Sequence, residues 1–389
     1  MTRSDQSSWS RRQFLGGFSG VIAASSTLTP RLWARPAQEG RVTEEQAKEI
    51  YRKSISIDCL ANPNTVNILW PPPGPLTQIQ LDNVKASGLT AVNLTVGGSK
   101  RTFEETTRKI AFWTDQLDEH ASHLTLIRHH RDLDRAKREG RLGLIFGFQD
   151  TTSVGEDLTR LEVFYQLGVR IVQVTYNGWN LMGNGCLEPA DAGLSVLGRE
   201  AIAVMNELGI AVDLSHCGTR TTAEGIEASS KPPLITHSGC REVSPHPRSK
   251  EDRELRAMAD RGGVVGIYMV PFLGGGPGPP SEDLMMQHIE HALNVCGADH
   301  VGIGSDLGIT PVEETPEYMD AREVVLARRR GLGISSQGEE RPVYIPTLNH
   351  PRRLEGIAVT LAKRGHAAST IEKVIGGNFY RVFGEIWIN

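Results

Sequence analysis

The sequence lacks three features that would each point to a specialised class of protein. No run reaches the roughly eighteen consecutive apolar residues that a membrane-spanning helix needs. A net charge of −4 provides no basic surface field, so a nucleic acid is not expected as a partner. Five cysteines scattered through 389 residues do not form a disulfide framework, and their odd number leaves one thiol unpaired within a monomer. The remaining composition, 39% hydrophobic and 23% charged, suits a globular protein with a full-sized core.

The first residues have a different character from the rest. Ser10-Arg11-Arg12-Gln13-Phe14-Leu15 precedes a modestly apolar stretch, and small residues continue to Ala34 and Ala37. The pattern resembles a twin-arginine export signal, with a disordered basic tail as the alternative. We therefore expect a signal peptide and linker over residues 1–37, a single domain over residues 41–389, and a periplasmic or secreted protein.

After this segment, short β-branched apolar runs alternate with amphipathic stretches of helical length. This alternation predicts parallel strands, because each return to the same end of a sheet needs a helical crossover. Eight such units favour a closed (β/α)₈ TIM barrel of the α/β class over a doubly wound open sheet. The eight runs are 54–58, 89–96, 142–148, 169–176, 210–216, 233–238, 262–269 and 300–306.

Two connections are longer than such barrels usually have. Residues 177–193 follow the fourth run, and residues 310–347 follow the eighth and contain a helical stretch over 314–331. Long ordered loops at the carboxyl ends of barrel strands usually shape access to a site. The Gly/Pro-rich residues 274–280 have neither the lysine nor the context of a phosphate-binding loop, so they indicate a flexible turn.

Polar side chains stand where the predicted strands end, which is the edge of a parallel barrel that binds ligands. Two of these side chains are the imidazoles of His216 and His237, on consecutive strands. Neutral imidazoles suit zinc and similar ions, and a carboxylate completes a site that keeps a position open for water. The strand-end residues are Asp58, Cys59, Gln149, Asp150, Tyr176, His216, His237 and Asp306.

Each assignment has a structural alternative. A strand-end histidine can be a hydrogen-bonded structural residue, and Asp58 can cap the loop that follows it. Cys217 and Cys240 are interpreted as buried packing residues rather than thiolate ligands. Arg248, in the sequence Pro245-His246-Pro247-Arg248, can solvate a loop, but a guanidinium beside a metal is also well suited to bind a substrate carboxylate.

Several of these motifs together resemble the renal (membrane) dipeptidase family of the amidohydrolase superfamily. The resemblance extends over nearly all of residues 50–385. It is carried by Leu208-Gly209 with Asp213-Leu214-Ser215-His216, Thr236-His237-Ser238, His246-Pro247-Arg248, Arg261-Gly262-Gly263-Val264-Val265-Gly266, Gly302-Ile303-Gly304-Ser305-Asp306 and Gly376-Gly377-Asn378-Phe379-Tyr380-Arg381-Val382-Phe383.

The resemblance implies a (β/α)₈ barrel with a binuclear zinc site that hydrolyses dipeptides and related amides. The family's second-metal histidines fall on His216 and His237. Its strand-eight aspartate, a ligand and proton shuttle, falls on Asp306. The arginine that holds the substrate carboxylate falls on Arg248.

The family pattern fails on strands one, three and four. The strand-one ligands are replaced by Leu60 and Asn62, and the bridging glutamate by Gln149. The histidine that polarises the substrate carbonyl is replaced by Tyr176. Leucine cannot bind a metal, and a neutral amide is a poor bridge between two cations, so we expect the first metal site to be lost.

These replacements predict one Zn²⁺, or another divalent metal, per chain. Its ligands would be His216 and His237, with Asp306, Gln149 or the strand-one Asp58 joining them. In a hydrolase of dipeptide-like small molecules, Asp306 would act as base and Tyr176 would donate a hydrogen bond to the oxyanion. Alternatives are a different metal-assisted reaction on a related substrate and a catalytically silent binding protein. The sequence leaves open a homodimer and a role for Cys59 or Cys186.

Overall fold

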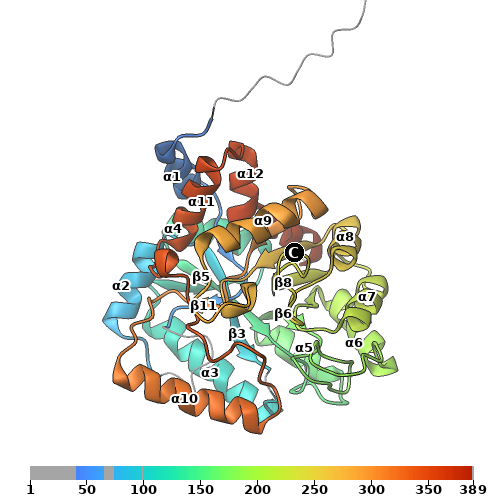
Figure 1. Ribbon diagram of the computed structural model, residues 1–389. Helices are drawn as coiled ribbons and strands as arrows, with labels where there is room; N and C mark the ends of the chain where they lie inside the picture. The colour runs from blue at the N-terminus through green and yellow to red at the C-terminus, as the bar shows by residue number, and fades with distance from the viewer. Residues whose placement is uncertain (1–40, 65–73, 99, 388–389) are drawn as a thin grey trace, which may run out of the picture. The chain divides into compact units, whose positions relative to one another are not determined.

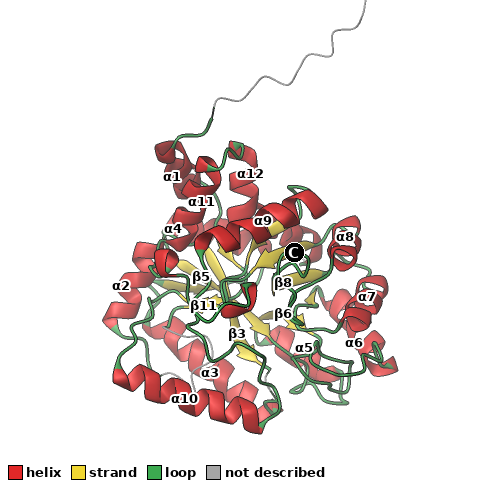
Figure 2. Ribbon diagram, viewed as in Figure 1, coloured by secondary structure: helices red, strands yellow, loops and turns green. Residues whose placement is uncertain are grey.

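The computed structural model describes residues 41–64, 74–98 and 100–387, so the twin-arginine segment lies outside the described residues. Within these residues, eight parallel strands close into a barrel in the order β1-β3-β5-β6-β7-β8-β9-β10, and β10 pairs with β1. Helices surround the strands (Figures 1 and 2). The predicted (β/α)₈ fold is therefore confirmed.

Each of the eight predicted runs coincides with one barrel strand, although β3 extends one residue beyond its run. These strands are β1 (Ile57–Asp58), β3 (Ala91–Gly97), β5 (Leu142–Phe148), β6 (Val169–Gln173), β7 (Ala211–Asp213), β8 (Leu234–Ser238), β9 (Val264–Ile267) and β10 (Val301–Ile303).

Three further strands were not predicted from the sequence. The strand β4 (Leu124–Leu126) pairs with the beginning of β5, and β2 (Ala61–Asn62) pairs with β11 (Leu307–Gly308). Each has only two or three residues, too few for an alternating pattern to stand out. The β2–β11 pair lies where the chain leaves β1 and β10, so it joins the two strand ends that carry Asp58 and Asp306.

The helices begin where the sequence offers capping side chains. At α3, for example, the Thr102 hydroxyl accepts a hydrogen bond from the backbone of Glu105, whose carboxylate accepts one from the backbone of Thr102. The helices are α1 (Glu44–Lys53), α2 (Gln78–Ser87), α3 (Phe103–Glu119), α4 (His130–Glu139), α5 (Thr159–Gln166), α6 (Val196–Leu208), α7 (Thr219–Ala228), α8 (Asp252–Asp260), α9 (Glu282–Cys296), α10 (Pro316–Gly331), α11 (Arg353–Lys363), α12 (Ala368–Glu372) and α13 (Asn378–Ile386).

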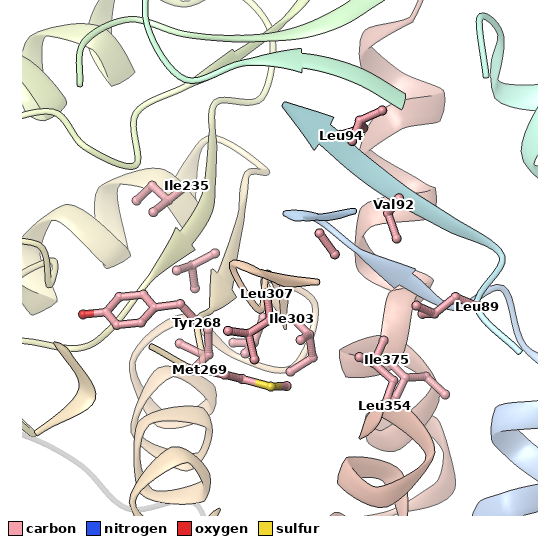
Figure 3. Packing of buried hydrophobic residues seen from close by; sticks show 14 of the residues in the cluster. Leu89, Val92, Leu94, Ile235, Tyr268, Met269, Ile303, Leu307, Leu354 and Ile375 are labelled. Carbon is pink, nitrogen blue, oxygen red and sulfur yellow. The ribbon is translucent and has the colours of Figure 1, made fainter. Parts of the chain in front are cut away.

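The core has two layers because successive strand residues point to opposite faces. Val92 of β3 packs in the large layer between strands and helices, part of which is drawn in Figure 3, whereas its neighbour Ala91 packs in the second layer. Phe379 and Phe383 of α13 join this second layer, and the Asn378 side chain donates to the carbonyl of Val301 at the beginning of β10. The helix α13 therefore fills the amino end of the barrel.

The opposite end, where the strands finish, carries the candidate site. No helix among the described residues is both long and apolar enough to cross a membrane.

Candidate metal centre and adjoining cavity

The two histidines predicted as a metal pair meet at the carboxyl ends of β7 and β8. Their Nε2 atoms are 2.9 Å apart, and their ring centroids are separated by 4.9 Å at an interplanar angle of 59°. His216 is 3% exposed and His237 is fully buried. The barrel therefore brings together two strand ends that are 21 residues apart in the chain.

Hydrogen bonds fix which nitrogen of His216 carries its proton. The Asn177 side-chain nitrogen donates to the carbonyl of Ile334 at 2.7 Å, so the Asn177 oxygen faces His216. That oxygen lies 2.7 Å from Nδ1 of His216 and can only accept, so Nδ1 carries the proton. The lone pair of His216 is therefore on Nε2.

The same reasoning applies to His237. The Thr236 hydroxyl donates to the Asp213 carboxylate at 2.6 Å, so it accepts from Nδ1 of His237 at 2.9 Å. Asp213 also accepts from the backbone nitrogens of Ser215 and Thr236, which holds β7 and β8 in register below the histidines. The lone pair of His237 is on Nε2 as well.

Two Nε2 lone pairs that face each other at 2.9 Å repel, and a cation bound by both nitrogens removes that repulsion. Burial lowers the pKa of both imidazoles well below the usual value, and the nearby Arg248 guanidinium lowers it further. Both rings are therefore neutral, as metal ligands must be. The chemistry of this donor pair fits a divalent metal.

Tyr176 lies against this pair, where the family has a histidine. Its ring stacks on His216 with centroids 4.1 Å apart, and its hydroxyl accepts a hydrogen bond from Arg329 at 2.9 Å. Arg329 is itself paired with Glu339. Burial raises the pKa of Tyr176, and the Arg329 charge opposes this shift. The phenol therefore keeps its proton and, because its oxygen accepts from Arg329, can donate that proton elsewhere.

Asp306 follows β10 in a left-handed backbone conformation with φ +59°, which few residues other than glycine adopt. Such a conformation costs on the order of 1–3 kcal/mol and often marks a functional position. The backbone nitrogen of Asp306 donates to the carbonyl of Leu60, and its side chain lines the same cavity as Tyr176 and His216. Sequence reasoning had named all three residues.

Asp58 and Gln149, the other predicted ligands, make contacts within the barrel wall. Asp58 is fully buried, and its carboxylate accepts from the backbone nitrogen of Ser305 at 2.7 Å and from the Ser305 hydroxyl at 2.5 Å. It thereby anchors the residue next to Asp306. The Gln149 side chain donates to the Thr95 hydroxyl at 3.0 Å.

Arg248 is buried beneath the histidine pair. Its guanidinium donates to the carbonyls of Ser215 at 2.6 Å and His237 at 3.3 Å, so it ties together the two segments that carry the histidines. Among the described residues its buried Nε has no hydrogen-bond partner. Its role as a carboxylate clamp stays a prediction.

Strand one offers no metal ligand at the position of Leu60, whose side chain is 1% exposed. The Asn62 side chain accepts from the backbone of Asn64 at 2.8 Å. Of the two cysteines left open by the sequence, Cys59 is fully buried, and the Cys186 thiol lies 3.6 Å from the Asn177 oxygen that holds His216.

We looked for groups of three or more His, Cys, Asp or Glu side chains whose ligand atoms all lie within 4.8 Å of one another. In the part of the chain that the structure describes, Glu242, Asp252 and His291 form the one such group. Glu242 lies in the connection between β8 and α8, Asp252 begins α8 and His291 lies on α9, and Asp252 also pairs with Arg256. Among the described residues, no third His, Cys, Asp or Glu side chain therefore stands this close to both His216 and His237.

A cavity of about 90 Å³ adjoins the histidine pair. Sequence reasoning missed Asn177, Arg329 and Glu339, which also line it. Asn177 could have been found from the sequence, because it directly follows the predicted Tyr176. Arg329 could not, because it is 153 residues from Tyr176 in the chain and no local pattern links the two. The lining residues are Tyr176, Asn177, His216, Val270, Pro271, Phe272, Asp306, Leu307, Gly308, Val312, Tyr318, Arg322, Val325, Leu326, Arg329, Glu339 and Val343.

Residues 76–327, well over half of the chain, match the family described as membrane dipeptidase (peptidase family M19). This protein belongs to that family. The dipeptidase tcpJ of Claviceps purpurea is 27% identical to it over 237 residues, which are 59% of this chain. The alignment spans about half of that relative, 55% of its length.

Solved structures place the M19 chain among similar barrels. An amidohydrolase from Pseudomonas aeruginosa is 32% identical, with a TM-score of 0.77 over 88% of this chain and 99% of that one. A metallo peptidase from Rhodobacter sphaeroides, solved with a phosphinate mimic of the dipeptide L-Ala-D-Ala, has a TM-score of 0.66 at 17% identity. It covers 85% of this chain and 100% of its own, and it supports the fold alone.

Proposed function

We propose that this protein is a metal-dependent hydrolase that cleaves dipeptide-like or other carboxylate-bearing amides at a mononuclear site. The observation that carries the proposal is the pair of histidine Nε2 atoms that face each other at 2.9 Å, both unprotonated. Membership of the M19 family and the similarity to tcpJ, a protein named as a dipeptidase, support the reaction class.

His216 and His237 would hold one ion of Zn²⁺ or another divalent metal, with Asp306 or Gln149 as further candidate ligands. Such an ion polarises a substrate carbonyl and lowers the pKa of bound water toward neutrality. Leu60 and Asn62 stand where the family has strand-one ligands, which favours one ion over two.

The side chains around the pair suit three separate tasks. Tyr176 is positioned by Arg329 to donate its hydroxyl proton to the substrate's carbonyl oxygen as negative charge develops there. Asp306 serves as base and accepts the proton that the attacking water loses. Arg248 would bind the substrate's carboxylate through guanidinium N–H groups other than the two that donate to the carbonyls of Ser215 and His237.

A metal count tests the mononuclear site. Protein purified with zinc should hold one ion per chain by elemental analysis, and His216→Ala or His237→Ala should lose it. Two tightly bound ions per chain would contradict the proposal, because the strand-one position would then be occupied despite Leu60.

Turnover of a dipeptide panel with added zinc, manganese, cobalt or copper tests the reaction. Arg248→Ala should raise KM for a dipeptide more than for the same dipeptide with an amidated C-terminus, since only the former presents a carboxylate. Equal changes for both substrates would remove the clamp from the proposal. Absence of turnover with the site fully loaded would argue against hydrolysis.

A different metal-assisted reaction is the second candidate. The observation that favours it is the lack, among the described residues, of a third His, Cys, Asp or Glu ligand atom within 4.8 Å of both histidine nitrogens. A catalytically silent binder is the third candidate. It predicts that the parent protein shows no turnover and that His216→Ala still binds the substrate.

We also infer export across the cytoplasmic membrane from the Arg11-Arg12 motif. Fractionation of a bacterial host should recover the protein in the periplasm or medium, and an Arg11→Lys/Arg12→Lys variant should stay in the cytoplasm. The same distribution for both proteins would exclude a twin-arginine route. Whether the exported protein is a homodimer is decided by its mass in solution.

A further inference from the structure

The cavity beside the histidine pair has a wall built by one face of α10. Tyr318, Arg322, Val325, Leu326 and Arg329 line it, and they recur at three- and four-residue spacings on this helix. The helix α10 belongs to the long connection after β10, outside the βα repeat of the barrel (orange in Figure 1). This wall is therefore supplied by a connection rather than by a helix of the βα repeat.

Both α10 arginines in this wall already have protein partners. Arg322 donates to the backbone carbonyls of Glu339 at 3.1 Å and Arg341 at 2.7 Å. Arg329 pairs with the Glu339 carboxylate and donates to the Tyr176 hydroxyl. The Arg329 charge is therefore compensated by Glu339, whereas Arg322 is bonded to neutral backbone oxygens.

A third arginine fixes this segment to the opposite wall. Arg341 donates to the carbonyls of Pro271 at 2.5 Å, Gly274 at 2.7 Å and Gly276 at 2.6 Å, all in the connection between β9 and α9. The same connection supplies Phe272 to the cavity. The two walls are therefore held together by charged side chains bonded to backbone oxygens, and the space between them is preformed.

Eight of the lining residues are apolar. An apolar side chain gains free energy by leaving water for such a surface, whereas a charged side chain that packs against it would lose its hydration. A preformed apolar wall beside a few polar groups is the usual design of a site that selects one substrate side chain. The apolar lining residues are Val270, Pro271, Phe272, Leu307, Val312, Val325, Leu326 and Val343.

We propose that α10 is the specificity element of this site and that the preferred substrates carry an uncharged, branched aliphatic or aromatic side chain that packs against Leu326 and Phe272. The inference rests on the proposed hydrolysis of dipeptide-like amides and adds the class of side chain. The polar end of the cavity, with Tyr176, His216 and Asp306, then faces the scissile amide.

The test compares the leucine- and glutamate-containing members of two dipeptide pairs, Leu-Ala with Glu-Ala and Ala-Leu with Ala-Glu. For at least one pair, kcat/KM should be ten-fold or more higher for leucine. In Leu326→Glu this ratio should fall toward one. Val324→Glu is the matched control, because Val324 is on the same helix but 56% exposed, and it should keep the parental ratio.

Leu326→Ala provides a second variant in case Leu326→Glu does not fold, which a thermal unfolding curve would reveal. The enlarged cavity should shift preference from leucine toward phenylalanine by several-fold. A leucine-to-glutamate ratio near one in the parent protein, or an unchanged ratio in a folded Leu326→Glu, would overturn the specificity assignment.

Binding separates failure of this inference from failure of the proposed function. Two phosphinate dipeptide mimics, one with an isobutyl and one with a carboxyethyl side chain, are titrated calorimetrically into zinc-loaded protein. Tighter binding of the isobutyl compound supports the inference even if no dipeptide is cleaved, a result that would reject only the hydrolase. Equal binding together with unselective dipeptide cleavage would reject only the inference.

Discussion

Asn177 and Thr236 determine the chemistry of the two histidines through hydrogen bonds with their Nδ1 atoms. Each accepts a hydrogen bond from an Nδ1 atom, which leaves the lone pair on Nε2, the nitrogen that faces the other ring. Such outer partners raise ligand basicity and hold ring orientation. The metal affinity of this site therefore depends on residues that would not be recognised as ligands.

Asn177→Leu should weaken metal binding about 10- to 100-fold, because His216 would lose the bond that fixes its tautomer and ring orientation. Competition with a chelator of known affinity measures this change. His216→Ala, which removes the ligand itself, should abolish binding in the same assay. An unchanged affinity in Asn177→Leu would mean that ring packing alone orients His216.

Tyr176→Phe should lower kcat by about 10²- to 10³-fold with little change in KM, because the hydroxyl would act on charge that develops after binding. Steady-state kinetics on the best dipeptide measures the effect. Arg329→Met should reproduce part of the loss, since Arg329 positions the Tyr176 oxygen. Tyr165→Phe, on α5 outside the site, is the control, and a fall in kcat of similar size there would remove the special role of Tyr176.

At the scale of elements, α13 closes the end of the barrel opposite the site. Phe383 is fully buried and stacks on Trp387, with ring centroids 4.3 Å apart. Phe379 of the same helix packs against the glycine at position 302 of β10, where a larger residue would collide with the ring. The helix α13 therefore fills the amino end of the barrel interior. The opposite end, where the strands finish, is left to bind a substrate.

Phe383→Ala should lower the free energy of unfolding by about 3–5 kcal/mol, the usual cost of removing a buried aromatic side chain. Denaturant titration followed by circular dichroism measures it. Glu385→Ala, on the exposed side of α13, should change stability by no more than about 0.5 kcal/mol. Similar losses in both variants would indicate a general weakness of this helix rather than loss of the interior packing.

At the scale of the whole molecule, the metal should couple the site to global stability. A ligand that binds only the folded state adds about 2.7 kcal/mol when its concentration is 100 times Kd. Thermal unfolding of chelator-treated protein should therefore occur at a lower temperature than unfolding of zinc-loaded protein. His216→Ala/His237→Ala should show no such difference, and a zinc effect that persists in it would locate the stabilising ion elsewhere.

The family and the barrel fold could both be predicted from the sequence, because each depends on patterns within short segments of the chain. Strand after strand shows a short apolar run that ends in a polar residue, and the helix expected over 314–331 is observed as α10, which begins after the capping residue Thr315. The histidine pair was accessible for the same reason, since the carboxyl ends of consecutive parallel strands must meet.

The sequence by itself thus determined the barrel, the two histidines at its mouth and the replacement of the strand-one ligands by Leu60 and Asn62. Only the tertiary structure decided the tautomers of the two histidines and the hydrogen bonds from the buried Arg248 to backbone carbonyls. It also decided the hydrogen bond from Arg329 to the Tyr176 hydroxyl. The physical reason is that periodicity reports which face of an element is buried. The partner of a polar side chain, by contrast, depends on contacts between segments far apart in the chain.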